Sequence, residues 1–262
     1  MAVVMETTPI LSVRDLSKRF GGVQALAGVS FDVGVREIVS IIGPNGAGKT
    51  TVFNMICRLY QPSAGAISFG SVDLLRRLPH HLAGLGIGRT FQNLALFRHG
   101  TVTDNILVGL HAHLASGVLA GALWLGPTRA EEIRALEEAE KIIEFLEIEE
   151  IRHRPVATLS YGLQKRVELG RALATRPRLL LLDEMVSGMN QEETEDIARF
   201  VLDLRDELGI SILMIEHDMN VVMDISDTVH VLNFGQPIAS GTPAEIAANP
   251  AVVDAYLGTS RS

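Results

Sequence analysis

A glycine-rich segment in the first quarter of the chain constrains its possible folds more than any other feature of the sequence. Residues 43–51 read GPNGAGKTT and match the phosphate-binding pattern GxxxxGK[ST] at every fixed position. The apolar run 37–42 before it is typical of a buried strand, and the pattern of residues 51–59 after it is typical of a helix. Glycines between a strand and a helix allow backbone N–H groups and the positive end of the helix to bind an anion. The segment therefore predicts a nucleoside triphosphate site rather than a chance glycine-rich turn.

The loop supplies most of the expected nucleotide contacts. Lys49 is expected to reach the β- and γ-phosphates, and the hydroxyl of Thr50 is expected to bind Mg²⁺. The ATP-binding residues predicted in this loop are Gly43, Pro44, Asn45, Gly46, Ala47, Gly48, Lys49, Thr50 and Thr51.

The remaining pattern predicts an α/β fold. Residues 11–20 and 27–33 alternate apolar and polar side chains, as half-buried antiparallel strands do, and Gly21-Gly22 between them marks a turn. Continuous apolar runs at 178–182 and 211–215 alternate with helical patterns, which predicts a mostly parallel sheet covered on both faces. We therefore expect a P-loop NTPase core, an antiparallel β subdomain near the N-terminus and an inserted helical subdomain.

The predicted organisation is a single nucleotide-binding domain over residues 1–262. Residues from about 1–92 and 176–262 form its core with the β subdomain, and about 93–175 form the helical subdomain. Within the latter, residues 130–146 carry a charged amphipathic pattern, most simply explained by a helix with one face in water.

Acidic and imidazole side chains follow two of the apolar strands directly. Asp183 and Glu184 come after the run 178–182, and His217 comes just after the run 211–215. Ligands of parallel sheets bind at the carboxyl ends of strands, so these side chains are expected at the same edge as the phosphate loop. Asp183 fits a Mg²⁺ site, and Glu184 fits a general base for an attacking water. The alternatives are a solvated acidic strand end and a surface histidine.

A second motif, LSYGLQKR, occupies residues 159–166, before a helix expected over 167–175. Ser160 and Gly162 at a helix N-terminus can present a hydroxyl and N–H groups to an anion. Alone, the motif is no more than a helix cap. Its place between the helical insertion and Asp183 favours a functional interpretation.

The order of these motifs resembles that of the ATP-binding cassette (ABC) ATPases over nearly the whole chain. That resemblance implies a dimer in which two subunits enclose two ATP molecules. The phosphate loop of one subunit would then face the signature residues of the other, which here are Ser160, Tyr161, Gly162, Leu163 and Gln164. Leu163 departs from the usual glutamine and Met185 from the usual proline, whereas Ser160 and Gly162 are retained, so ATP hydrolysis is expected.

The resemblance also implies roles for single residues. Phe20 would stack on adenine, for which the alternative is a core aromatic. Gln92 would sense the attacking water and join Thr50 and Asp183 around Mg²⁺. His217 would contact the γ-phosphate as a catalytic residue beside Glu184 and Gln92. Asn190 would lie in a loop that crosses between the subunits.

Several segments narrow the resemblance to the ATPases of branched-chain amino-acid importers. These segments are SKRFGG at 17–22, RTFQN at 89–93, IEHDM at 215–219 and the tail from GTP at 241–243 to AYLG at 255–258. The implied partners are a second ABC ATPase, identical or related, two membrane permeases and, indirectly, an external solute-binding protein. The implied location is the inner face of the cell membrane, where the subunit is cytoplasmic and peripheral.

Composition agrees with this reading. A formal charge of −8 argues against a general affinity for nucleic acid, and the single cysteine, Cys57, can form no internal disulfide. The start of the chain lacks the pattern of a signal peptide, and the apolar stretch 117–126 is too short to span a bilayer. The region 111–126, with Trp124, is expected to pack on the helical subdomain, or alternatively to touch the permease or the bilayer surface.

Three other functions fit part of the pattern. An ABC ATPase acting on nucleic acid or ribosomes usually has two cassettes or long coiled-coil insertions, and this chain has one cassette and no long heptad run. A phosphotransferase would use the phosphate loop but would not explain the signature, Gln92 or His217. An importer of another solute, such as urea or amides, remains an alternative because the permeases and binding protein choose the cargo.

Overall fold

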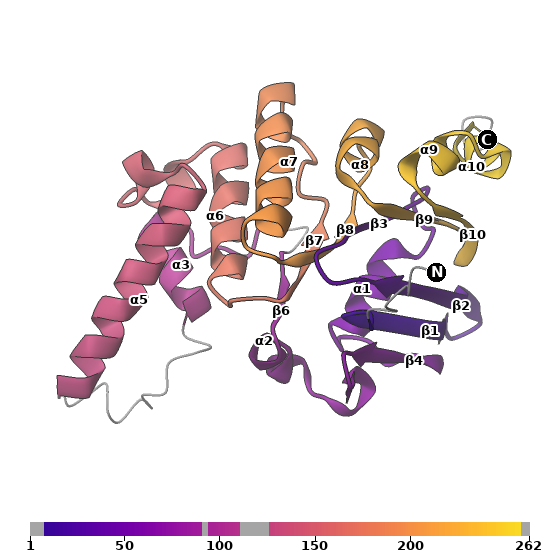
Figure 1. Ribbon diagram of the computed structural model, residues 1–262, viewed down its shortest axis with the longest axis horizontal. Helices are drawn as coiled ribbons and strands as arrows, with labels where there is room; N and C mark the ends of the chain where they lie inside the picture. The colour runs from indigo at the N-terminus through magenta and orange to yellow at the C-terminus, as the bar shows by residue number, and fades with distance from the viewer. Residues whose placement is uncertain (1–7, 91–93, 111–125, 258–262) are drawn as a thin grey trace, which may run out of the picture.

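The computed structural model describes residues 8–90, 94–110 and 126–257, which form two β-sheets and a set of helices (Figure 1). The smaller sheet has the strand order β2-β1-β4-β5, and the larger has the order β10-β9-β3-β8-β7-β6. The strands of the smaller sheet are β1 (Leu11–Phe20), β2 (Val23–Val33), β4 (Ala64–Phe69) and β5 (Val72–Asp73). Those of the larger sheet are β3 (Ile38–Ile42), β6 (Ile87–Arg89), β7 (Leu179–Asp183), β8 (Ser211–Ile215), β9 (Thr228–Asn233) and β10 (Gln236–Gly241).

Some helices lie between strands along the chain, and others follow one another directly. They are α1 (Lys49–Ile56), α2 (Leu82–Leu85), α3 (Val102–Leu110), α5 (Gly126–Phe145), α6 (Tyr161–Leu173), α7 (Gln191–Asp206), α8 (Met219–Ile225), α9 (Pro243–Ala247) and α10 (Pro250–Leu257). Short 3₁₀ turns lie at Leu74–Arg76, Pro79–His81, Glu149–Ile151 and Val156–Thr158.

The smaller sheet is antiparallel throughout, as its alternating sequence predicts. On β1, Leu11, Val13 and Leu16 are fully buried, while the residues between them face outward or lie half-buried. The turn at residues 21–22 joins β1 to β2, which begins at Val23, earlier than the predicted start at residue 27.

The larger sheet is parallel except for its last strand. β3 pairs in parallel with β8 and β9, and β7 pairs in parallel with β8 and β6, whereas β10 pairs antiparallel with β9. Every residue of β3, β7 and β8 is buried, because helices or the other sheet cover both faces. These three neighbouring strands lead into the phosphate loop, Asp183-Glu184 and His217, so their carboxyl ends gather the predicted site at one edge.

Helix α1 packs between the two sheets (Figure 1). One buried cluster joins Phe53 of α1 to Val39 and Ile41 of β3 and to Leu11 and Val13 of β1. Burial of this apolar surface fixes the start of α1, and with it the phosphate loop, against the sheet.

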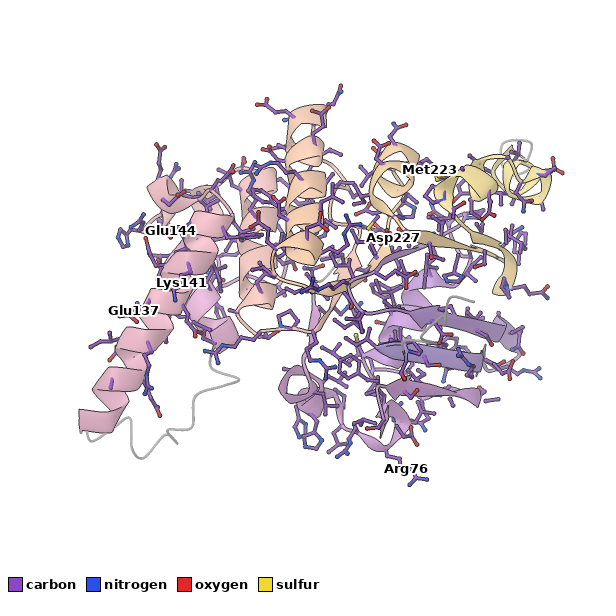
Figure 2. All side chains as sticks on the ribbon, viewed as in Figure 1. Arg76, Glu137, Lys141, Glu144, Met223 and Asp227 are labelled. Carbon is purple, nitrogen blue, oxygen red and sulfur yellow. The ribbon has the colours of Figure 1, made fainter. Side chains whose placement is uncertain are left out.

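The opposite face of the larger sheet carries the remaining core. A second buried cluster runs from Ile38 and Leu180 in the sheet through α7 to α3, α5 and α6. Its stripe on α5 includes Ala135, Ala139 and Ile143, at the four-residue spacing of one helix face. Figure 2 shows the charged residues Glu137, Lys141 and Glu144 along the outer side of α5, as the amphipathic pattern predicts.

One predicted helix boundary is wrong. Helix α6 begins at Tyr161 rather than at residue 167, because the Ser160 hydroxyl accepts the N–H of Leu163 at 3.3 Å and so starts the helix earlier. The last strand, β10, begins at Gln236, which pairs with Asn233 of β9. A proline in β10 is tolerated because this strand lies at the edge of the sheet.

Candidate active site

The phosphate loop depends on two glycines whose conformations exclude side chains. Gly43 has φ +148°, and a Cβ there would lie 2.0 Å from the carbonyl oxygen of Leu232 in β9. Gly48 has φ +100°, and its Cβ would lie 2.6 Å from the Cδ2 atom of Leu26 in β2. The loop therefore lies directly against both neighbouring strands, and only glycine permits that approach.

Lys49 folds back over its own loop. Its Nζ donates to the carbonyl oxygens of Gly43 at 2.6 Å and Pro44 at 3.1 Å, and the residue is 5% exposed. Burial lowers the pKa of its ammonium group, while the carboxylates of Glu184 and Asp183 act in the opposite direction. An anionic phosphate would add to these carboxylates in stabilising the charged form of Lys49.

Asp183 ends β7 as a buried carboxylate. Its Oδ2 atom accepts a bond from Arg89 Nη2 at 2.9 Å, and the side chain is 1% exposed. Its Oδ1 atom is buried and has no hydrogen-bond partner among the described residues. Burial raises the pKa of this carboxyl, against the lowering effect of Arg89. An oxygen left without a partner in this way is a suitable ligand for a cation.

Glu184 and His217 meet across the ends of β7 and β8. His217 Nε2 and Glu184 Oε1 lie 2.5 Å apart. Glu184 adopts a left-handed backbone, with φ +52°, and its N–H donates to the carbonyl oxygen of Ile215 at 2.9 Å. A carboxylate held against an imidazole in this way can accept a proton from a water molecule.

A cavity of about 490 Å³ brings Lys49, Glu184 and His217 together. It is lined by Val23, Gln24, Ala25, Asn45, Gly46, Ala47, Gly48, Lys49, Thr50, Thr51, Glu184, His217 and Phe234. The size suits a small-molecule ligand. Most of the predicted phosphate-loop residues, together with the predicted base and histidine, therefore line one cavity.

Other predicted residues lie elsewhere. Phe20 is not among the cavity-lining residues; it packs edge-on against Tyr60, with Lys18 over its ring, while its strand partner Val23 lines the cavity. Gln92 and the stretch around Trp124 lie outside the described residues. The adenine contact of Phe20 and the water-sensing role of Gln92 stay predictions.

The signature residues lie apart from this cavity, at the start of α6. Ser160 and Tyr161 are exposed, and Gln164 donates from Nε2 to the carbonyl oxygen of Leu159 at 2.9 Å. A Cβ on Gly162 would meet the side chain of Glu193 on α7 at 2.3 Å, so this glycine permits the close approach of α6 and α7.

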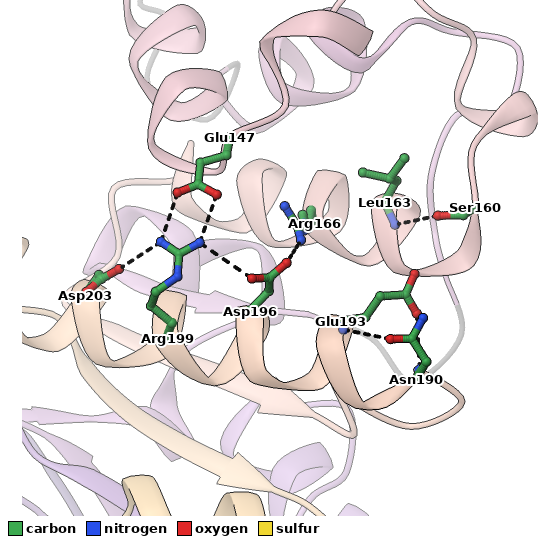
Figure 3. A network of polar contacts seen from close by, with 9 residues as sticks. All are labelled: Glu147, Ser160, Leu163, Arg166, Asn190, Glu193, Asp196, Arg199 and Asp203. Carbon is green, nitrogen blue, oxygen red and sulfur yellow. Dashed lines mark hydrogen bonds and ion pairs between the residues drawn. The ribbon is translucent and has the colours of Figure 1, made fainter.

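Polar contacts cap α7 and join it to its neighbours (Figure 3). Asn190 caps α7 by accepting the N–H of Glu193, whose carboxylate accepts the N–H of Asn190 in return. Arg166 of α6 pairs with Asp196 of α7, and Arg199 pairs with Glu147 at 2.9 Å. Arg166 thus ties α6 to α7, and Arg199 ties α7 to Glu147, which follows α5.

Sequence reasoning missed several residues in or beside the site, among them Val23, Gln24 and Ala25 of the cavity lining. Arg89 lies within a quoted motif, but nothing in the sequence indicates its pairing with Asp183. Phe234 is 83% exposed at the turn between β9 and β10, and it lines the cavity beside the phosphate loop. Glu216 could have been found, because an acid that directly follows a fully apolar strand is expected to need partners.

Among the described residues, no helix is long and apolar enough to cross a membrane, and no three acidic, histidine or cysteine side chains gather as a metal cluster.

Comparison with protein families matches residues 26–187 to the ABC transporter model and residues 236–261 to that of the branched-chain amino acid ATP-binding cassette transporter. The chain is 45% identical over 250 residues to the high-affinity branched-chain amino acid transport ATP-binding protein BraF of Pseudomonas aeruginosa, covering 95% of this chain and 98% of BraF. It is 42% identical over 250 residues to LivG of Escherichia coli, which has the same description, again covering 95% and 98%.

Solved structures are similar over the same length. A nucleotide-free ATP-binding cassette from an ABC transporter has a TM-score of 0.82 at 34% identity, covering 95% of this chain and 98% of that one. The ADP conformation of MJ1267, an ATP-binding cassette of an ABC transporter, has a TM-score of 0.84 at 35% identity, covering 96% and 100%.

Proposed function

The chain belongs to the ABC transporter family of ATP-binding cassettes, and we propose that it is the ATP-hydrolysing subunit of an importer for branched-chain amino acids. One observation carries the ATPase part: the phosphate loop, Glu184 and His217 line a single cavity at the carboxyl ends of neighbouring strands. The cargo is supported by the C-terminal match at residues 236–261 and by the names of the relatives.

Different residues of the cavity would have different roles in ATP hydrolysis. The phosphate loop and Lys49 would bind the β- and γ-phosphates through N–H groups and the ammonium. Glu184 would take the proton of the attacking water, a contribution typically worth a factor of about 10² to 10⁴ in rate. His217, bonded to Glu184 at 2.5 Å, would hold that carboxylate in place and contact the γ-phosphate.

The donor set also fits Mg²⁺. Asp183 Oδ1, which has no hydrogen-bond partner in the described part of the chain, and the hydroxyl of Thr50, an exposed residue at the cavity, would hold the ion together with Gln92. Few protein ligands are needed, because Mg²⁺ in such sites keeps waters and binds substrate phosphates. The bound ion would neutralise charge on the phosphates.

The site is completed by a second subunit in this proposal. The signature residues 160–164 do not line the cavity of their own chain, and Ser160 and Tyr161 are exposed and available to another. We infer that they face the nucleotide of an identical or related ATPase, with Asn190 near the crossing between subunits. The helical residues 93–175 and the core would then shift relative to each other as ATP binds and is hydrolysed.

Transport requires further partners. Two permeases would hold the ATPase dimer at the cytoplasmic face of the membrane, and an external solute-binding protein would deliver the cargo. ATP binding would draw the two ATPases together, and hydrolysis would release them, so that the permeases alternate between two states.

Uptake by whole cells tests the cargo. A strain lacking this gene should lose high-affinity uptake of radiolabelled leucine, and the wild-type gene should restore it. Lys49→Ala should not restore uptake although the protein is produced, because the variant lacks the phosphate-binding cation. Undiminished leucine uptake in the deletion strain, with loss of urea or amide uptake instead, would assign another cargo and leave the ATPase assignment intact.

A further inference from the structure

Glu216 is a buried carboxyl group with no role in the mechanism above. It lies between Ile215, the last residue of β8, and His217, and it is 3% exposed. A buried carboxyl group is costly unless hydrogen bonds satisfy it, so its partners indicate what it does.

Its partners come from both strand ends that supply the catalytic pair. Its Oε1 atom accepts the N–H of Val186 at 3.2 Å. The backbone N–H groups of Met185 and His217 also donate to the carboxyl group. One side chain therefore joins the segment after β7 to the segment after β8.

The residue held in this way is Glu184, which precedes Met185. Its left-handed backbone, with φ +52°, is unfavourable for a residue with a side chain and persists only where the surroundings enforce it. On its N-terminal side, its own N–H is bonded to the carbonyl oxygen of Ile215 at 2.9 Å. On its C-terminal side, the next two N–H groups are bonded to Glu216.

We propose that Glu216 is a positioning residue, which holds the backbone at residues 185–186 and so directs the Glu184 carboxylate toward His217. The proposal rests on the proposed function, in which Glu184 is the general base. Met185 and Val186 are 1% and 6% exposed, so no solvent water replaces the carboxyl group as their acceptor. Burial raises the pKa of Glu216 to about 7 against the effect of its three N–H donors, which agrees with a tightly enclosed group.

Two substitutions at Glu216 remove its acceptor oxygens to different extents. Glu216→Gln keeps the shape and one acceptor oxygen, and Glu216→Leu removes both oxygens. We expect kcat for ATP to fall about fivefold in the first and ten- to a hundredfold in the second, because a displacement of about 1 Å at the base costs up to this much. The Kd for a fluorescent ATP analogue should stay within about twofold of wild type, since Glu216 does not line the cavity.

Ser211→Ala is the matched control. Ser211 is also fully buried on β8 and also accepts a backbone N–H, that of Arg36 at 2.9 Å, but at the far end of the strand. Because Ser211→Ala removes a buried acceptor far from the catalytic pair, it should lower the melting temperature but leave kcat per nucleotide-binding site unchanged. If Glu216→Leu does not fold, Glu216→Gln alone decides, and a kcat within twofold of wild type overturns the proposal.

A double-mutant cycle with Glu184→Gln tests whether Glu216 acts through Glu184. Single-turnover rates should show that adding Glu216→Gln to Glu184→Gln lowers the residual rate by less than about twofold. A full additional loss would mean that Glu216 acts by another route. Wild-type turnover by Glu184→Gln alone would instead refute the proposed role of Glu184, so the two failures are distinguishable.

Discussion

Replacing Arg89 by methionine would remove the cation that pairs with the buried carboxylate of Asp183 at the end of β7. Arg89 Nη2 lies 2.9 Å from Asp183 Oδ2, and the two side chains are 11% and 1% exposed. Methionine fills similar volume without a charge, so Asp183 would remain buried without its cation. Breaking a buried pair on one side costs about 3–5 kcal/mol. At roughly 2 °C per kcal/mol for a chain of this size, the melting temperature should fall by about 6–10 °C.

Calorimetry of the nucleotide-free protein at pH 7 would measure this loss for Arg89→Met, Asp183→Asn and the double variant. The double variant should be more stable than Arg89→Met, because asparagine leaves no unpaired charge. The deficit should also shrink toward pH 5, since protonation of Asp183 removes the same charge and its pKa is already raised by burial. A melting temperature of Arg89→Met within 2 °C of wild type, or strictly additive losses in the double variant, would refute the reasoning.

Three further variants test other contacts. Gly43→Ala should abolish nucleotide binding in a fluorescence titration, because its Cβ would lie 2.0 Å from the Leu232 carbonyl oxygen; Gly21→Ala, with φ +55° and nothing within 4 Å, should keep wild-type affinity. Glu216→Gln should change the pH dependence of stability. Burial raises the pKa of Glu216 from 4.5 to about 7, so the native state binds the proton more tightly than the unfolded state does. Denaturant titrations should therefore show that wild type loses about 3 kcal/mol of unfolding free energy relative to the variant between pH 4.5 and 7. Ser160→Ala should lower the free energy of unfolding by about 1 kcal/mol through the lost cap, and light scattering should show no ATP-dependent dimer; unchanged dimer formation would count against the signature contact.

Much of the fold follows from sequence periodicity. The continuous apolar runs became β7 and β8, buried on both faces, and the alternating segments became β1 and β2. Placement of Glu184 and His217 at one edge also follows, because parallel strands bring their carboxyl ends together. These relations depend on strand direction alone and need no knowledge of side-chain packing.

Contacts between distant segments could not be predicted in this way. The pairing of Arg89 with Asp183 depends on β6 lying beside β7, a neighbour relation that no local pattern encodes. Helix α6 starts earlier than its apolar pattern suggests because one hydroxyl, that of Ser160, caps it. The sequence shows that Glu216 directly follows a buried strand, but it does not indicate its three N–H donors, which the packing of two loops brings to it.

ATP-driven uptake of leucine by reconstituted vesicles tests the central claim most directly. The complex would be purified from native membranes through a tag on this chain, and Glu184→Gln would serve as the matched variant. We expect uptake that requires ATP inside the compartment facing this subunit, and loss of uptake in Glu184→Gln with nucleotide binding retained. Leucine uptake that is independent of ATP, or undiminished in Glu184→Gln, would contradict the account.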